Sequence, residues 1–172
     1  MRPPIHDMRV RTPSQDAEFP GKKLAQTSPF GGQYGEGVRS LGAGRHQGWD
    51  LYANPGTVTL AITAGVVQKV TTDSSYGLQV LLQFRHQGRE LYAFYAHLAS
   101  AFVHPGEQVK EGQVLAVTGS SGNAVHVPPH LHFEIRTKAE VGPLWDGRIN
   151  PGEVLGYHYL NLDFSHPRGD MG

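Results

Sequence analysis

Glycine and proline interrupt this chain at short intervals, and this feature limits the possible folds more than any other. The 172 residues include 22 glycines and 12 prolines, and both residue types weaken or end regular helices and strands. No stretch between them shows the apolar period of a helix of three turns. The chain therefore predicts many short strands joined by turns, with few or no helices.

The segments between these interruptions have the composition of strands. Residues 57–72 are rich in valine, threonine and isoleucine and predict one or two strands around Ala64 and Gly65. We expect further strands at 78–84, 89–98, on both sides of Gly112 within 109–117, and at 130–137. The fold class that follows is all-β: a single antiparallel sheet or sandwich-like domain with few or no helices.

The two ends of the chain lack this regular pattern. We expect residues 1–27 to form an N-terminal arm, 28–155 the folded domain and 156–172 a C-terminal tail. A chain of this length can bury a core without disulfide or metal crosslinks.

Composition excludes several classes of function. There are 15 Lys and Arg against 15 Asp and Glu, so the formal net charge is zero, which argues against a nucleic-acid partner. The absence of cysteine excludes thiolate metal sites, disulfides and cysteine nucleophiles. No apolar run reaches the ~18 residues of a membrane span. The opening MRPPIHDMRVRTP has prolines and charges where a signal peptide would be apolar, so we expect no export signal in this chain.

The segment His130-Leu131-His132-Phe133-Glu134-Ile135 alternates polar and apolar residues. On a strand, His130, His132 and Glu134 would share one face, and the apolar residues would face the core. Two imidazoles on one rigid strand face suit a metal site. Glu134 either orients a metal-binding histidine or lies at the surface.

Two more motifs contain histidine. His46 is followed four residues later by Asp50 in a glycine-containing stretch, and zinc accepts both nitrogen and oxygen ligands. His97 ends the aromatic-rich segment in the sequence Tyr95-Ala96-His97-Leu98. Each motif alone is also compatible with an ordinary surface or core-edge histidine.

Together, and in this order, these motifs resemble the lysostaphin-type, or LytM-like, zinc endopeptidases that cut peptidoglycan cross-bridges. The resemblance covers residues 28 to 155 and implies the duplicated hybrid motif fold of that family, with a substrate groove walled by loops. Further matching positions are Ser28-Pro29-Phe30-Gly31, Arg45, Ala64-Gly65-Val66-Val67, Gly106, Val109, Gly112, Gln113, Gly119 and Ile149-Asn150-Pro151.

The resemblance implies that His46, Asp50 and His132 bind one Zn2+ per chain. It also implies that His97 and His130 stand beside the metal. One would be the general base toward a zinc-bound water, and the other would steady the oxyanion; we favour His130 as the base. Zinc lowers the pKa of its water to about 7, and an imidazole can take that proton and deliver it to the leaving amine. The implied activity is hydrolysis of peptide bonds in peptidoglycan cross-links or stem peptides.

Three positions depart from the family pattern or lie where substrate would bind. Leu78 stands where many members have asparagine after the glycine that matches Gly77. Tyr34 is the candidate for a tyrosine that precedes the first zinc histidine in many members. The loop before His130 is longer than in the shortest members and contains His126. We therefore expect Tyr34, Leu78 and His126 to contact substrate.

Two other readings are compatible with parts of this pattern. A non-catalytic member of the family would bind peptidoglycan or regulate another cell-wall hydrolase. A cupin-type metalloprotein would use His130, His132 and Glu134 for iron or manganese, but leaves the other motifs unexplained.

The expected substrate lies in the cell wall, in the periplasm or outside the cell. Two readings follow from the missing signal: the chain is a mature or trimmed form, or it leaves the cell by a route that needs no such signal, such as delivery by a phage or a secretion system. An injected effector would have an inhibitor or immunity protein as partner.

Overall fold

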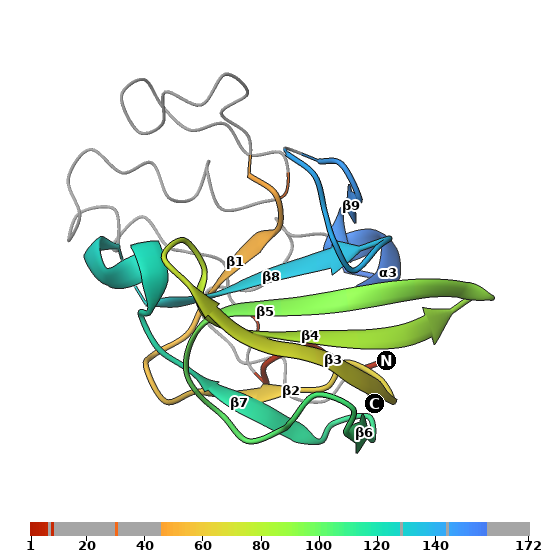
Figure 1. Cartoon of the computed structure of the whole chain (residues 1–172), viewed down its shortest axis with the longest axis horizontal. Helices are drawn as coiled ribbons and strands as arrows, with labels where there is room; N and C mark the ends of the chain where they lie inside the picture. The colour runs from red at the N-terminus through yellow and green to blue at the C-terminus, as the bar shows by residue number, and fades with distance from the viewer. Residues whose placement is uncertain (7, 9–29, 31–45, 128, 144, 158–172) are drawn as a thin grey trace.

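The computed structural model describes residues 1–6, 8, 30, 46–127, 129–143 and 145–157. Within them the chain is almost entirely β-structure (Figure 1). The elements are β1 (Trp49–Tyr52), β2 (Val58–Leu60), β3 (Gly65–Asp73), β4 (Gly77–His86), β5 (Arg89–Ala101), β6 (Gln108–Val109), β7 (Val114–Thr118), the 3₁₀ helix η1 (Gly122–His126), β8 (His130–Arg136), β9 (Arg148–Ile149) and α3 (Pro151–Leu155).

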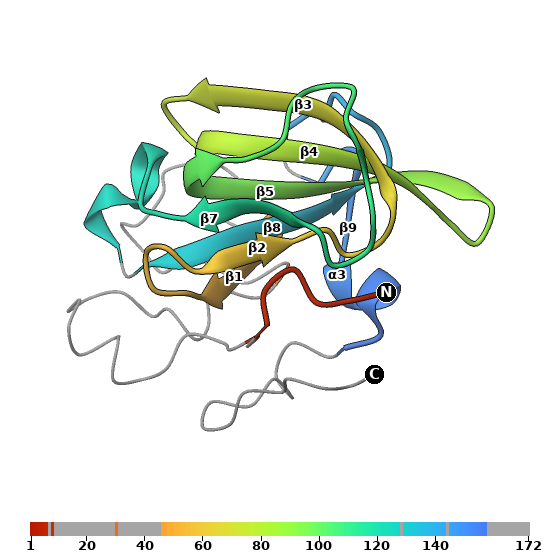
Figure 2. The same ribbon diagram turned by 90° about the horizontal axis from the view of Figure 1, so that it is seen from below.

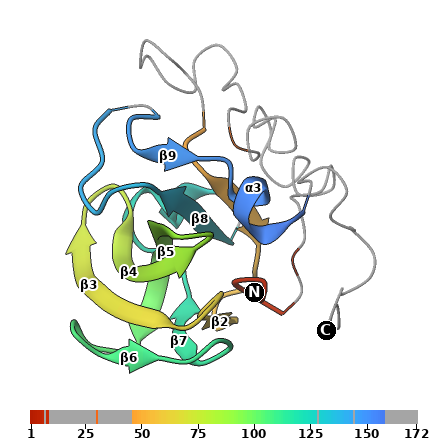
Figure 3. The same ribbon diagram turned by 90° about the vertical axis from the view of Figure 1, so that its right-hand side faces the viewer.

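All pairings in this sheet are antiparallel. Its main path runs β1-β8-β5-β4-β3-β6, while β7 pairs with both β2 and β5, and β9 pairs with β8. Figures 2 and 3 show the long strands β3, β4 and β5 side by side and the sheet curving toward β6 and β7. The prediction of an antiparallel all-β fold with few helices is therefore confirmed. The glycine-containing stretch that begins at His46 is a bend leading into β1.

The alternation along β5 separates two apolar clusters. Leu91, Ala93 and Tyr95 belong to the main core, whereas Tyr92, Phe94 and Ala96 form a smaller cluster with Leu81. On β8, the apolar Leu131, Phe133 and Ile135 likewise join the main core. The face of the sheet that carries the smaller cluster is therefore the face on which His130, His132 and Glu134 lie.

The first residues of the chain pack against the domain. Ile5 and Met8 are buried in the main core, and the Leu60 N–H donates to the Pro4 carbonyl at 2.8 Å. An arm was expected here, and the described part of it contacts the edge near β2. The proposed boundary at residue 28 lies outside the described residues.

The Asn150-Pro151 pair begins the short helix α3. The Asn150 side chain accepts a hydrogen bond from the Gly152 N–H at 3.0 Å, and Pro151 occupies the first turn, where its missing N–H costs nothing. Gly156 ends the helix in a left-handed conformation with φ 77°. No helix among the described residues is long and apolar enough to span a membrane.

Candidate metal centre

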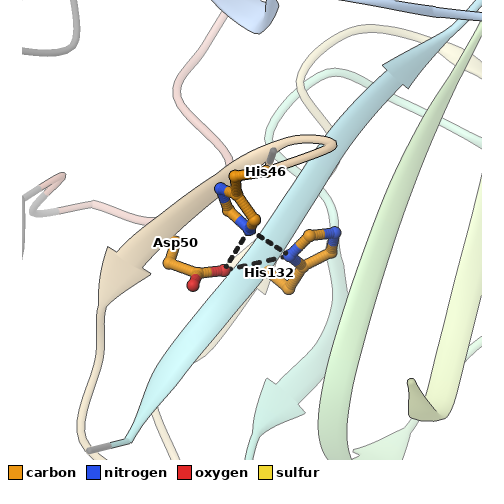
Figure 4. Close-up of side chains that lie close together, drawn as sticks. All are labelled: His46, Asp50 and His132. Carbon is orange, nitrogen blue, oxygen red and sulfur yellow. Dashed lines mark hydrogen bonds and ion pairs between the residues drawn. The ribbon is translucent and has the colours of Figure 1, made fainter. Parts of the chain in front are cut away.

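Three side chains from β1, its preceding bend and β8 converge (Figure 4). Asp50 and His132 are direct partners in the β1–β8 register. Their atoms Asp50 Oδ1 and His132 Nδ1 lie 2.9 Å apart, and His46 Nε2 lies 3.1 Å from each of them. Within the described part of the chain, this is the one group of three such residues whose ligand atoms converge.

This donor set suits a zinc ion. Zinc binds histidine nitrogen and carboxylate oxygen, and a tetrahedral ion with bonds of about 2.0–2.1 Å separates neighbouring ligand atoms by about 3.3 Å. The three observed separations of 2.9–3.1 Å are close to that spacing. A single cation between these lone pairs would satisfy all three atoms together.

Gly48 allows β1 to approach β8 this closely. A side chain at Gly48 would collide with the Phe133 carbonyl and would come within 2.8 Å of Glu134 Cγ. The glycine between His46 and Asp50 is therefore a packing requirement of the site, because the two strands could not hold this register around a larger residue.

Glu134 fixes the orientation of the His132 ring. The His132 Nε2–H donates to Glu134 Oε1 at 2.9 Å, so in the neutral ring it is Nδ1, facing His46 and Asp50, that carries the lone pair. Glu134 is fully buried, and its Oε2 accepts from Arg136 Nε at 2.6 Å and from Arg148 Nε at 2.9 Å. The open question about Glu134 is thereby answered: it is not a surface carboxylate.

The charges around Glu134 explain why a buried carboxylate is tolerated. Burial by itself raises the pKa of Glu134, but the contact with His132 and the two guanidinium groups outweigh burial and hold this pKa well below its usual value. Arg136 in turn lies 3.6 Å from the centre of the Phe94 ring. The Tyr76 hydroxyl is 3.0 Å from Glu134 Oε1 and 2.9 Å from Gln47 Oε1.

The electrostatics of the three converging residues favour a cation. Burial lowers the pKa of His132, but the hydrogen bonds with Asp50 and Glu134 dominate and raise it to about 9. Burial likewise raises the pKa of Asp50, yet the neighbouring His46 and His130 hold it well below its usual value. A site that attracts a proton this strongly also attracts a metal ion, and the two compete.

His97 and His130 lie beside these residues. Their rings are edge to face with centroids 4.9 Å apart, and both are buried. His130 Nε2 lies 3.5 Å from Asp50 Oδ1, and the His97 ring centroid lies 5.9 Å from that of His132. The His97 Nδ1–H donates to the Ser121 carbonyl at 2.9 Å. The five histidine and aspartate residues selected from the sequence thus form one cluster.

Of the three residues expected to contact substrate, the structure describes Leu78 and His126. Leu78 is half-buried, packs against the main core and reaches the site region through its backbone N–H, which donates to Ser121 Oγ at 3.0 Å. His126 is exposed on η1. Tyr34 lies outside the described residues. The cupin-type grouping does not form, because Glu134 contacts the side of His132 that faces away from Asp50.

Sequence reasoning missed several residues that contact this cluster. Arg148 reaches Glu134 from β9, fourteen positions away in the chain, and no local pattern indicates that contact. Trp145 places its Nε1–H 3.4 Å from the His46 carbonyl while its ring stays 38% exposed. Glu134, in contrast, was indicated by the period-two pattern of the β8 segment, which put it on the His132 face.

Comparison with known proteins gives three informative matches. The sequence profile of peptidase family M23 matches residues 44–143. The murein hydrolase activator EnvC of Escherichia coli is 36% identical over 124 residues, which are 72% of this chain and 26% of EnvC. The glycyl-glycine endopeptidase ALE-1 of Staphylococcus capitis is 34% identical over 110 residues, 62% of this chain and 29% of ALE-1. The chain thus spans less than a third of the length of these relatives.

A similar solved structure is the catalytic domain of the antimicrobial peptidase lysostaphin from Staphylococcus simulans. The two share 27% sequence identity with a TM-score of 0.62, and the match covers 75% of this chain and 90% of the lysostaphin domain. The likeness thus extends over nearly all of a catalytic domain.

Proposed function

This chain belongs to peptidase family M23, and from that premise we propose that it is a zinc metallo-endopeptidase that hydrolyses peptide bonds in bacterial peptidoglycan cross-links or stem peptides. The observation that supports this most is the convergence of His46 Nε2, Asp50 Oδ1 and His132 Nδ1 within 3.1 Å of one another. We further propose that the catalytic domain spans residues 28–155.

His46, Asp50 and His132 would hold the zinc ion. A bound zinc ion supplies Lewis acidity, which polarises a peptide carbonyl and makes water a stronger nucleophile near neutral pH. The protein contributes two imidazoles and one carboxylate, so the site keeps a net positive charge when zinc is bound. Such a charge favours the oxyanion that forms during peptide hydrolysis.

His130 is proposed as the general base. Its Nε2 lies 3.5 Å from the Asp50 carboxylate, which would stabilise the imidazolium formed when His130 takes a proton from water. β8 fixes the direction of its side chain, because successive residues on a strand point to opposite faces.

His97 is proposed to steady the oxyanion. Its Nδ1–H is engaged by the Ser121 carbonyl, so a hydrogen bond to substrate uses Nε2. His97 donates from Nε2 only when both ring nitrogens carry protons. In that form it can also protonate the leaving amine.

Digestion of isolated peptidoglycan sacculi tests this proposal. Sacculi with directly linked stems and sacculi with glycine bridges are incubated with the protein, and the fragments are analysed by mass spectrometry. Wild type is expected to release peptide fragments whose ends identify the cut bond. His130→Ala and EDTA-treated protein are the controls, and both are expected to release none.

A second candidate function is regulation of another cell-wall hydrolase. The similarity to a murein hydrolase activator favours it, since that relative matches 72% of this chain. A zinc-loaded protein that cuts neither kind of sacculus, yet accelerates digestion by an added hydrolase, would replace the first proposal with this one. In both cases the protein acts on the cell wall, and an inhibitor that covers the site is its expected partner if it is delivered as an effector.

A further inference from the structure

His97 has a backbone conformation that is uncommon for residues other than glycine. Its φ is 60°, in the left-handed region, which only a few per cent of non-glycine residues adopt, with histidine, asparagine and aspartate enriched among them. It lies in a bulge of β5: Leu78 pairs with Leu98 and Val80 with Tyr95, so two residues of β5 face one of β4. Such a conformation persists only when the surrounding structure holds it.

The bulge lies where β5 stops pairing with β8 and begins pairing with β7. β5 pairs with β8 as far as Ala96, which faces His132, and with β7 from Leu98 onward. β7 and β8 therefore diverge at His97. The segment that connects them begins at Gly119, whose N–H donates to the His97 carbonyl at 2.9 Å. The loop after β7 is thus in direct contact with the bulge.

Ser121 in this loop makes three hydrogen bonds around His97. Its carbonyl accepts from His97 Nδ1 at 2.9 Å. Its hydroxyl donates to the Leu98 carbonyl at 2.7 Å and accepts from the Leu78 N–H at 3.0 Å. The side chain of Ser121 therefore joins β4 to β5 on either side of the bulge, while its backbone holds the imidazole.

Two glycines let the loop come this close. A side chain at Gly77 would collide with Ser121, and a side chain at Gly122 would collide with Tyr76 and Gly77. Both glycines have positive φ, 64° and 68°. The Asn123 N–H also donates to the Ser75 carbonyl at 2.9 Å. The β3–β4 turn and the β7–β8 loop thus interlock, and Ser121 lies at their contact.

We propose that Ser121 is a positioning residue: its hydroxyl anchors the β7–β8 loop so that its carbonyl holds His97 in the Nδ1–H tautomer and directs Nε2 toward the reaction. This inference rests on the proposed function, because it requires His97 to act on substrate. It adds a residue that the motifs do not mark. A carbonyl can only accept a hydrogen bond, so this contact selects one of the two neutral tautomers of the ring.

The first test reads the His97 tautomer directly and needs no substrate. Nitrogen-15 NMR of the zinc-loaded protein distinguishes protonated from unprotonated ring nitrogens, and the His97 signals are identified by their loss in His97→Gln. Wild type is expected to show Nδ1 protonated and Nε2 unprotonated when the ring is neutral. Ser121→Ala is expected to show a mixture of tautomers, with the backbone amide spectrum of the sheet unchanged.

Ser120→Ala is the matched control, since the Ser120 hydroxyl makes no hydrogen bond in the described structure. It is expected to leave the His97 signals as in wild type. If Ser121→Ala keeps the wild-type tautomer, the inference is wrong.

The second test is kinetic, and its substrate is a synthetic peptide that contains the intact bond identified in the sacculus assay. Ser121→Ala is expected to lower kcat by about 10- to 100-fold, as misplaced catalytic groups do, with KM and zinc content unchanged. In a His97→Ala background the same change is expected to have no further effect, because Ser121 acts through His97.

The kinetics of His97→Ala and Ser121→Ala together distinguish failure of this inference from failure of the proposed function. Full activity of His97→Ala would contradict the role of His97 itself. Reduced activity of His97→Ala, combined with an equal loss from Ser121→Ala in both backgrounds, would keep the proposed function and overturn the role of Ser121.

Discussion

His132 and His97 are both buried imidazoles whose rings are oriented by a hydrogen bond, but the acceptors of these two bonds differ in charge. His132 donates to Glu134, a buried carboxylate that is itself bound by Arg136 and Arg148. His97 donates to a neutral backbone carbonyl in a loop. The first ring lies on a regular strand and the second on a strained bulge.

The difference matches the two chemical roles proposed for these histidines. A metal ligand has to keep one lone pair in a fixed direction, and a charged acceptor behind it also raises its basicity. His97, in contrast, is held by a neutral carbonyl, which orients the ring without placing a negative charge behind it. For these two histidines, the proposed roles in metal binding and in catalysis thus go with partners of different charge.

The largest expected effect comes from removing the ring of His132. We expect His132→Ala to lose both stoichiometric zinc and all detectable hydrolysis, because one of the three proposed ligands is gone. Atomic emission measurement of zinc and the sacculus assay check this together. Retention of one tightly bound zinc would contradict the assignment of His132.

Removing the ring of His97 is expected to lower the rate of hydrolysis without loss of zinc. His97→Ala should keep one zinc per chain and lose about 10²- to 10⁴-fold in kcat, the range for loss of an acid–base group. The exposed His104 offers a matched control, and His104→Ala should behave as wild type. Equal losses of zinc in the His97 and His132 variants would erase the distinction between the two residues.

A smaller effect is expected from neutralising the partner of His132. Glu134→Gln can still accept a hydrogen bond from Nε2 but loses the charge that balances Arg136 and Arg148. Zinc affinity, measured by competition with a chromophoric chelator, should fall by about 10- to 100-fold. Glu153→Gln, on the exposed face of α3, is the control and should leave affinity unchanged. An unchanged zinc affinity in Glu134→Gln would show that the hydrogen bond to His132 is sufficient without the negative charge of Glu134.

The smallest expected effect is a pH dependence of stability in the metal-free protein. The pKa of His132 is raised in the folded state to about 9 from an ordinary 6.5, so protonated His132 favours folding. This contribution is complete below about pH 6.5 and is lost as the pH rises through about 9. The Tm of metal-free wild type should therefore decrease over that interval, and that of His132→Gln should decrease less. Parallel curves for the two proteins would contradict the strong coupling of His132 to its carboxylates.

The sequence predicts which histidine and aspartate residues form this cluster better than it predicts the contacts that hold them in place. Strand alternation places His130 and His132 on one face, and the spacing of His46 and Asp50 is local, so both motifs are visible without any long-range contact. The left-handed bulge at His97 and its contact with Ser121 depend on where β7 and β8 diverge. The Arg148–Glu134 contact depends on the pairing of β9 with β8, and the burial of Ile5 on how the first residues pack. None of these follows from periodicity, because each is fixed only when distant segments meet.

The direct pairing of Asp50 with His132 has a consequence for local unfolding. β1 is a four-residue strand at the end of the main path of the sheet, and it and the bend before it carry two of the three proposed ligands. If β1 detaches from β8, the ligand set comes apart, so a bound ion opposes this opening by the free energy of its own binding. The amide protons of β1 should therefore exchange with solvent more slowly in zinc-loaded than in metal-free protein, while those of β3, far along the sheet, exchange alike in both. The pairing of β1 with β8 and the capacity to cleave peptides would then both depend on the same zinc-binding equilibrium.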